Sequence, residues 1–243
     1  MKILLVANTD WYLFRFRLSL ARSLREQGYQ VVFISPSGQY ASQLESEDFR
    51  WMSWEVGRQS INPLKEVGAV IDLLRIIKKE KPDLMHLHTI KPVLYGSLCA
   101  WLYKKITVVR SITGRGYIFL GGDVRARLLR PLVKAIYRFT LNSGRGAVIF
   151  ENKTDRDYFV GQKLVNPDQA SVIEGVGVDT EYYSLAHEPE GIPVIILAGR
   201  MLWDKGVGTF VEAARLLHHK VSARFVLVGQ PDAGNPASIA VGI

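Results

Sequence analysis

Two cations stand where an expected strand gives way to an expected helix. Arg200 and Lys205 lie five residues apart in GRMLWDKG (199–206), after the apolar run IPVIILA and before VGTFVEAARLLHH. The amides and the dipole at a helix N-terminus favour an anion, and two further cations would hold a diphosphate and neutralise the charge that develops as it leaves. The stretch therefore predicts a diphosphate site, although Asp204 could cap the helix or pair with either cation.

Two histidines form a second candidate centre, in HLHTIKP (86–92). Alternation along a strand at 83–88 would point His86 and His88 to one side, with His88 at the strand's end. Ligands of open parallel sheets bind beyond the carboxyl ends of the strands, so His88 is the candidate catalytic residue. It would donate a hydrogen bond to a sugar hydroxyl or relay a proton, while one of the two histidines is structural. Two histidines without a clustered carboxylate or cysteine are a weak metal signal, and we predict no metal site.

Other polar residues follow the same strand ends and are candidates for a ligand cleft. An arginine near the start of the first helix lies close to any crevice, although it could equally be an ordinary solvated side chain. A lysine at a helix N-terminus indicates an anionic ligand, because the helix dipole disfavours a cation there. The glycine-rich loop of RSITGRGYIFLGGD can approach a ligand closely. The candidates are Arg17, Lys91, Arg110, Thr113, Gly114 and Gly116.

The segment RARLLRPLVKAIYRFTLNSGR (125–145) carries basic residues and no acidic ones. Its cations recur at helical spacing and form one stripe, and its leucines and isoleucine occupy the remaining surface of the helix. Helices that lie on membranes have this pattern. Nucleic acid is the other anionic partner for such a helix, and a merely solvated outer face is the third interpretation. We predict an anionic membrane surface as the partner and no nucleic acid. The predicted membrane-facing residues are Arg127, Arg130, Lys134 and Arg138.

The totals are those of a globular protein with an anionic partner. The 243 residues are 48% hydrophobic and 22% charged, with a formal net charge of +8. The lone Cys99 lies among apolar neighbours, which indicates a buried hydrophobe and neither a disulfide nor a zinc ligand. The first apolar run is too short for a signal peptide, and no run is long enough to span a bilayer. We therefore expect a cytoplasmic protein that touches membrane only at its surface.

The elements that must position these residues alternate between strand and helix. This order predicts an α/β fold with a doubly wound parallel sheet covered on both faces. Helices are expected over 16–28, weakly over 40–48, over 62–82 and over 92–105, besides the basic segment 125–145. Strands are expected at 2–8, 29–35, 50–56, 83–88, 106–111, 146–152 and 170–175.

A polar stretch with two prolines, LAHEPEGIP (185–193), predicts a linker, so the domains are expected at 1–185 and 186–243. After it come only a strand, a helix and a strand, over 194–199, 206–220 and 223–229. Two strands and one helix would leave a sheet exposed. We therefore expect the second domain to be cut short, with little activity in the present chain.

Several of these stretches together carry a family likeness. GRMLWDKGVGTFVEAARLL followed by FVLVG resembles the second-domain start of family 4 glycosyltransferases, retaining enzymes with the two Rossmann-like domains of the GT-B fold. VIEGVGVDTEYY resembles their interdomain pattern, here Gly175, Gly177, Val178 and Asp179. HLHTIKPVLYGSLCAWL, SITGRGYIF and FRFRLSLARSLREQGYQVVFIS resemble a bacterial subgroup that builds polysaccharides on polyprenyl-diphosphate carriers. The resemblance extends over essentially the whole chain.

This resemblance implies a complete N-terminal Rossmann-like domain and the first βαβ portion of a second one. It implies that Arg200 and Lys205 hold the diphosphate of a nucleotide-sugar donor. The loops around Arg17, His88 and 113–117 would face a polyprenyl-diphosphate-linked or saccharide acceptor. The family needs no metal or other cofactor, retains anomeric configuration, and can use the leaving diphosphate to assist attack by the acceptor hydroxyl.

The resemblance also places the protein at the inner face of the cell membrane, with the helix over 124–142 resting on the bilayer. One family motif departs from the pattern, because its two spaced glutamates would lie beyond residue 243. We predict a glycosyltransferase of cell-surface polysaccharide synthesis. The alternatives are a nucleotide-sugar 2-epimerase of the same fold and a non-catalytic basic module that docks on membranes.

Overall fold

The computed structural model describes residues 1–57, 60, 62–103, 106–114, 124–232 and 237–239. It divides into two compact units, residues 1–178 and 179–243. The sequence placed this boundary after residue 185, whereas the first unit of the structure ends at Val178. Each unit is built on a parallel sheet, and the two are described separately.

The sheet of the first unit has seven strands in the order β3-β2-β1-β4-β5-β6-β7, and each neighbouring pair is parallel. The order reverses between β1 and β4, which is the switch point where doubly wound sheets bind ligands. The strands are β1 (Lys2–Val6), β2 (Gln30–Ser35), β3 (Arg50–Ser53), β4 (Leu84–His88), β5 (Thr107–Ile112), β6 (Gly146–Phe150) and β7 (Ala170–Val172).

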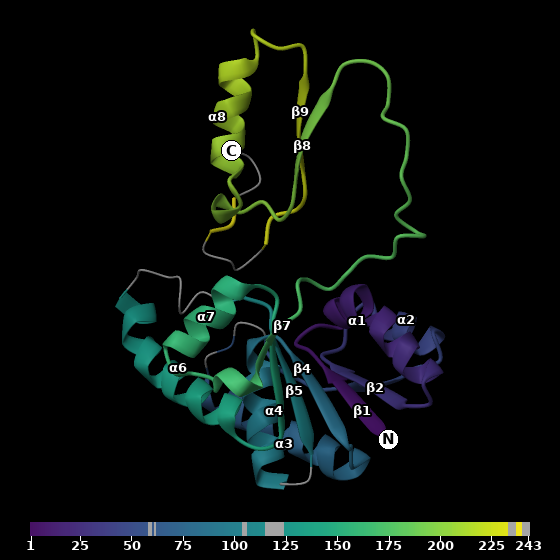
Figure 1. Ribbon diagram of the computed structural model, residues 1–243, viewed down its shortest axis with the longest axis vertical. Helices are drawn as coiled ribbons and strands as arrows, with labels where there is room; N and C mark the ends of the chain where they lie inside the picture. Colours follow the sequence, from purple (N-terminus) through teal and green to yellow (C-terminus); the bar gives the residue numbers. More distant parts are fainter. Residues whose placement is uncertain (58–59, 61, 104–105, 115–123, 233–236, 240–243) are drawn as a thin grey trace. The chain divides into compact units, whose positions relative to one another are not determined.

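Helices connect successive strands, and alternation along the strands gives the sheet two apolar faces. Ile3 and Leu5 of β1 pack with the buried side of α1, whereas Leu4 and Val6 belong to the larger core formed with α3 and α4. Figure 1 shows α1 and α2 beside β1 and β2, and α3, α4 and α6 elsewhere along the sheet. The helices are α1 (Asp10–Glu26), α2 (Ala41–Ser46), α3 (Pro63–Glu80), α4 (Ile90–Tyr103), α6 (Val124–Asn142) and α7 (Lys153–Gly161), with a short η1 (Pro167–Gln169). The α/β fold class predicted from the sequence is confirmed.

Capping residues explain two differences from the predicted helices. Helix α1 begins at Asp10 and not at residue 16, because the Thr9 hydroxyl accepts a hydrogen bond from the Tyr12 amide and caps the helix there. Helix α7 was not predicted, and Asn152 caps it in the same way by accepting from the Asp155 amide. Arg17 consequently lies two turns inside α1 and not at its start. This places its side chain over the sheet.

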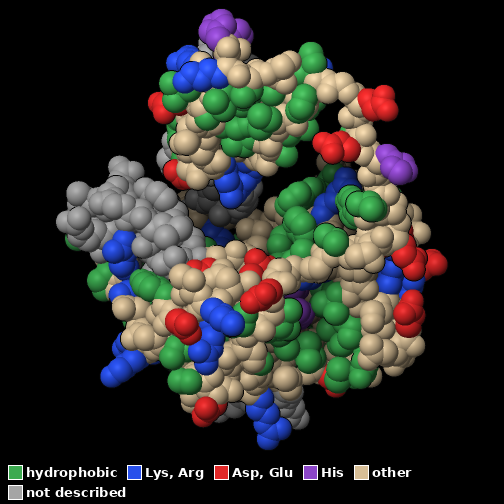
Figure 2. Space-filling view, turned by 45° about the horizontal axis from the view of Figure 1, so that its top comes forward, with side chains coloured by type: hydrophobic (Ala, Val, Ile, Leu, Met, Phe, Trp, Pro, Cys, Tyr) green, Lys and Arg blue, Asp and Glu red, His purple; other side chains and the backbone are tan. Residues whose placement is uncertain are grey.

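The second unit contains β8 (Val194–Ala198), η2 (Trp203–Lys205), α8 (Val207–Leu217) and β9 (Arg224–Val228). The two strands are parallel, in the strand–helix–strand order that the sequence predicts. Their apolar side chains are largely exposed, including Ile196 at 56% and Val228 at 49%. Hydrophobic side chains are visible on the surface of this unit in Figure 2.

Two helical glycines allow the packing of α4 on the sheet to be tested. A Cβ at Gly96 of α4 would lie 2.5 Å from Leu87 Cδ2 in the buried core, whereas a Cβ at Gly68 of α3 would have nothing within 4 Å. We expect Gly96→Ala to lower the free energy of unfolding by about 1 kcal/mol or more, because overpacking outweighs the helix propensity of alanine. Gly68→Ala should raise it by up to about 1 kcal/mol. Urea unfolding followed by circular dichroism checks both, and equal effects would contradict this close approach.

Candidate functional site

Arg17 and His88 meet at the carboxyl end of β4. Arg17 Nε donates a hydrogen bond to His88 Nδ1 over 3.1 Å, and an Arg17 terminal nitrogen donates to the Tyr12 hydroxyl over 2.6 Å. His88 has no exposed surface. Burial, the neighbouring His86 and the Arg17 charge all lower the pKa of His88 well below its ordinary value. The ring is therefore a neutral imidazole.

His86 extends this cluster along the same face of β4. The two histidine rings have centroids 4.0 Å apart, as expected from the alternation that places them on one side. His86 Nε2 lies 2.8 Å from the Ser111 hydroxyl of β5. Burial, and then the Arg17 charge, lower the pKa of His86 to about 3, so this ring is also neutral near pH 7.

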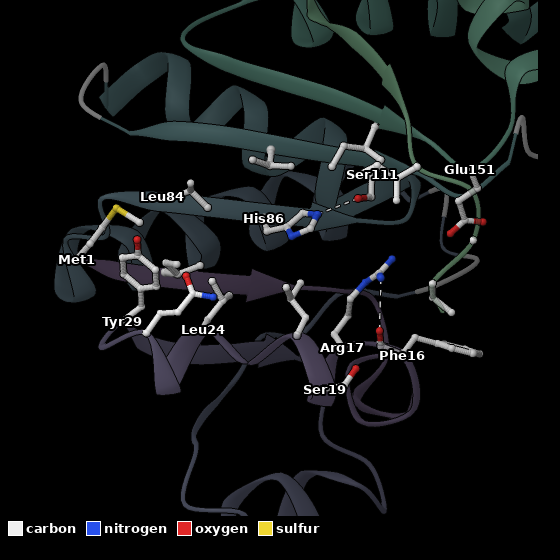
Figure 3. Close-up of a pocket in the computed structure, with 18 residues that line it drawn as sticks. Met1, Phe16, Arg17, Ser19, Leu24, Tyr29, Leu84, His86, Ser111 and Glu151 are labelled. Carbon is white, nitrogen blue, oxygen red and sulfur yellow. Dashed lines mark hydrogen bonds between the residues drawn. The ribbon is translucent and has the colours of Figure 1, made fainter. Parts of the chain in front are cut away.

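A cavity of about 560 Å³ runs over this face of the sheet. Its polar lining contains Arg17 from α1, His86, Ser111 and Glu151, the residue that follows β6. Figure 3 shows the Arg17 guanidinium reaching from its helix toward the sheet, with Glu151 across from it. Burial raises the pKa of Glu151, an effect that Arg17 opposes and Asp155 reinforces. The apolar lining includes Ile3, Leu20, Leu24, Leu84, Val109, Ile149 and Ile173.

The turn after β4 is strained and leaves two polar atoms without partners. Thr89 has a φ of 69°, a left-handed conformation that is costly for a β-branched residue. Among the described residues, neither Thr89 Oγ1 nor His88 Nε2 has a hydrogen-bond partner, although both atoms are buried. Backbone strain and unpartnered polar atoms together are typical of a functional turn.

Lys91 does not face this cluster, which corrects its prediction as a cleft residue. Its ammonium contacts Glu66 of α3 at 2.8 Å and donates to the Gly57 and Ser60 carbonyls at 2.6 and 2.7 Å. Three acceptors match its three N–H groups. The anion that the sequence predicted for Lys91 is therefore a carboxylate of this chain.

Arg110 is also not a cleft residue, because it lies in the core on the other face of the sheet. It is 1% exposed, and its guanidinium donates to the Ser97 hydroxyl and the Ser143 carbonyl at 2.8 and 2.6 Å. Burial lowers the pKa of Arg110 to about 10, so it still carries a charge at neutral pH. The guanidinium joins α4 to the end of α6. The sequence prediction failed because alternation along β5 directs this side chain away from the cavity.

The loop that follows β5 is described only in part. Thr113 is exposed and Gly114 is partly exposed, with a φ of 145° that glycine adopts readily. Gly116 lies outside the described residues. The assignment of this loop to the acceptor side stays a prediction.

Lys134 and Arg138, two of the basic residues of α6 whose side chains the structure describes, are held by partners on a neighbouring turn. Lys134 Nζ contacts the Gln162 side chain at 2.7 Å, and Arg138 Nε donates to the Lys163 carbonyl at 2.9 Å. Both thus fasten the turn that follows α7. Arg130 is half-buried, and Arg127 belongs to α6 but not to the residues whose side chains are described. Besides Arg138, the exposed residues of this helix include four large apolar ones: Leu128, Leu132, Ile136 and Phe139.

The two cations of the second unit differ in their surroundings. Arg200 pairs with the Asp232 carboxylate, whereas the sequence offered Asp204 as the acid that could pair with either cation. Lys205 ends η2 directly before α8 and is exposed, and within the described part of the chain it has no ion pair. The first turn of α8 contains no acidic residue. Lys205 and this helix N-terminus together favour an anion.

Sequence reasoning missed Tyr12, Ser111 and Glu151. Glu151 lies in the last two residues of the strand predicted over 146–152, close to the strand end where polar residues were sought, and so could have been found. Ser111 is directly paired with His88 in the register of β4 and β5, which sequence alone does not provide. Tyr12 was assigned to a loop because the start of α1 was predicted too late.

Comparisons with known proteins place this fold in a family. The profile of the family described as glycosyl transferase 4-like matches residues 2–152, more than half of the chain. A Campylobacter jejuni relative, N,N'-diacetylbacillosaminyl-diphospho-undecaprenol alpha-1,3-N-acetylgalactosaminyltransferase, is 24% identical over 96% of this chain and 64% of its own length. The UDP-Gal:alpha-D-GlcNAc-diphosphoundecaprenol alpha-1,3-galactosyltransferase of Escherichia coli is 24% identical over 73% of this chain and 48% of its own. The chain thus spans less than two thirds of either relative.

Solved structures share the fold at lower identity. Anabaena HepE in complex with UDP and glucose superposes with a TM-score of 0.68 at 16% identity, covering 96% of this chain and 62% of that one. The Neisseria meningitidis UDP-GlcNAc 2-epimerase gives 0.61 at 14% identity, covering 97% and 66%. The fold is therefore shared with an epimerase as well as with a protein that binds UDP and glucose. The family match identifies the chain further: it belongs to the glycosyl transferase 4-like family.

Proposed function

We propose that the chain is part of a glycosyltransferase that moves a sugar from a nucleoside-diphosphate donor to a polyprenyl-diphosphate-linked saccharide in polysaccharide synthesis. The family match carries this proposal, and the names of both curated relatives describe sugar transfer to an undecaprenol-linked diphosphosaccharide. In the transfer, the bond between the donor's anomeric carbon and the diphosphate breaks as a bond to the acceptor oxygen forms. The acceptor proton passes to the leaving diphosphate.

The charges of the second unit suit this step. Lys205, Arg200 and the N-terminus of α8 supply positive charge to a leaving diphosphate without a metal ion. We propose a metal-independent reaction that retains anomeric configuration. A chelator should leave the rate unchanged, and NMR of the product should show the anomeric configuration of the donor.

The direct test is transfer of labelled sugar from a panel of nucleotide sugars to a polyprenyl-diphosphate-linked saccharide. The assay uses this segment in a protein of its relatives' length, because the chain spans only 64% and 48% of theirs. Label in the lipid extract supports the proposal. Conversion of a UDP-sugar to its 2-epimer without any acceptor would instead favour the epimerase that shares this fold. Vesicle binding without turnover of any sugar would favour a non-catalytic docking module.

We further propose that the protein works peripherally at the cytoplasmic face of the membrane, through the apolar face of α3, α4 and α6. Within the described residues, no helix is long and apolar enough to cross a bilayer. An almost wholly apolar groove of about 630 Å³ lies among these three helices, lined by residues such as Val67, Val70, Ile71, Leu94, Leu98, Ile136 and Phe139. Exposed apolar side chains and a net charge of +8 suit an anionic lipid surface.

A further inference from the structure

His88 has a ring nitrogen whose protonation is decided by an arginine. A guanidinium keeps its protons at every pH that the fold tolerates, so Arg17 Nε can only donate in its 3.1 Å contact with His88 Nδ1. His88 Nδ1 must therefore present its lone pair, and the single proton of the neutral ring resides on Nε2. A proton on Nδ1 would point at a cation and have no acceptor.

The surroundings of Arg17 hold it in this role. Its guanidinium donates to the Tyr12 hydroxyl at 2.6 Å and lies 5.3 Å from the centre of the Tyr12 ring. The Tyr12 ring also lies against His88, with centroids 5.5 Å apart. The arginine is thus fixed by the same helix turn that contacts the histidine, and it cannot turn away without losing these contacts.

The other ring nitrogen is buried and lacks a partner in the part of the chain that the structure describes. Within the described residues, buried His88 Nε2 has no hydrogen-bond partner, and an unsatisfied buried N–H costs about 1–3 kcal/mol. Such a group is explained if a bound molecule supplies the acceptor. The neighbouring Thr89 Oγ1 is also without a partner, which marks the same turn as incomplete.

We propose that Arg17 is a positioning residue that locks His88 as a neutral Nε2–H donor, aimed at an uncharged oxygen of a bound sugar, and that His88 is not a proton relay. The role in sugar binding rests on the proposed function, whereas the tautomer is a property of this chain alone. The charged or titratable groups around the ring are Tyr12 and Arg17 from α1 and His86 from β4, with Glu151 acting on Arg17 from the end of β6. Of these, only the arginine is close enough to His88 Nδ1 to set its tautomer.

The test is ¹⁵N NMR of the 243-residue chain labelled at histidine, with His88 assigned from its missing signals in His88→Gln. Between pH 8 and 5.5 we expect a pyridine-like Nδ1 and a proton-bearing Nε2 that do not titrate. In Arg17→Met the two nitrogen signals should move toward each other as the tautomers exchange, whereas Arg17→Lys, which keeps a donor, should retain the lock. Arg15→Met removes an exposed cation from the same helix and should leave the His88 signals unchanged.

An Nδ1–H or doubly protonated His88 in the unaltered chain would overturn the proposal, and so would wild-type His88 signals in Arg17→Met. If Arg17→Met does not fold, the pH series of the unaltered chain and Arg17→Lys still decide the tautomer. In a transferase assay, Arg17→Met should lower kcat/KM about 10-fold or more, and His88→Gln, with its amide N–H, should retain more activity than His88→Ala. Absence of transfer in every variant, the unaltered protein included, contradicts the proposed function and leaves the NMR result standing.

Discussion

Replacing Arg200 and Lys205 together by alanine is expected to lower kcat/KM for sugar transfer by about 10³-fold or more. Removing one preorganised group that stabilises developing charge costs about 10²–10³-fold in other enzymes. Here two cations precede α8 in the chain, and no acidic residue in the first turn of this helix opposes a bound anion. The measurement is initial rate against donor concentration for the double variant and both single variants.

The Arg200–Asp232 ion pair makes the two single variants differ. Lys205→Ala removes a cation with no ion-pair partner among the described residues, so its loss should appear in transfer with little effect on stability. Arg200→Ala also leaves Asp232 without its ion-pair partner, as an anion near the proposed diphosphate, and should therefore lower transfer more than Lys205→Ala does. Arg215→Ala, in the last turn of α8, is the matched control and should have little effect. A double variant with undiminished transfer would exclude the proposed diphosphate site.

Introducing a charge on the apolar face of α6 is expected to have the next largest effect. Leu132 and Phe139 are 59% and 45% exposed. Each buries apolar area if it enters the lipid interface, so Leu132→Asp or Phe139→Asp should weaken binding to anionic vesicles about 10-fold or more. Sedimentation with vesicles of defined anionic lipid content measures this, with circular dichroism to check the fold.

The cations of α6 provide the matching control. Because Lys134 and Arg138 already contact the turn after α7, Lys134→Gln and Arg138→Gln should weaken vesicle binding much less than the aspartate variants. Raising the salt concentration should likewise have a modest effect if apolar insertion dominates. If the glutamine variants weakened binding more than the aspartate variants, the basic residues predicted from the sequence would be the membrane-binding surface instead.

Much of the fold was predictable because the signals that define it are local. Apolar runs marked the seven strands of the first unit, and Pro63 marked the start of α3. Three strands predicted to reach residues 56, 152 and 175 end earlier in the structure, at Ser53, Phe150 and Val172. Strand ends depend on pairing with neighbours that the sequence does not show.

The site was less predictable because it depends on the directions in which side chains point and on partners that are distant in the sequence. Alternation correctly paired His86 with His88, a relation within one strand. Lys91 and Arg110 were assigned to a cleft by their place near strand ends, but Glu66 and Ser143, more than twenty residues away, determine where their charges lie. The Arg17–His88 contact spans 71 positions, and only the β1–β4 adjacency brings it together.

The left-handed Thr89 has a consequence for engineering this protein. Glycine adopts that backbone conformation without strain, so thermostability selection alone would favour it at this position, by about 1–3 kcal/mol if the strain is fully relieved. The same replacement would delete a hydroxyl that the resting fold leaves unsatisfied. Variants selected only for heat resistance would thus tend to lose the Thr89 hydroxyl. A library of such variants should therefore be screened for ligand binding as well as for thermostability.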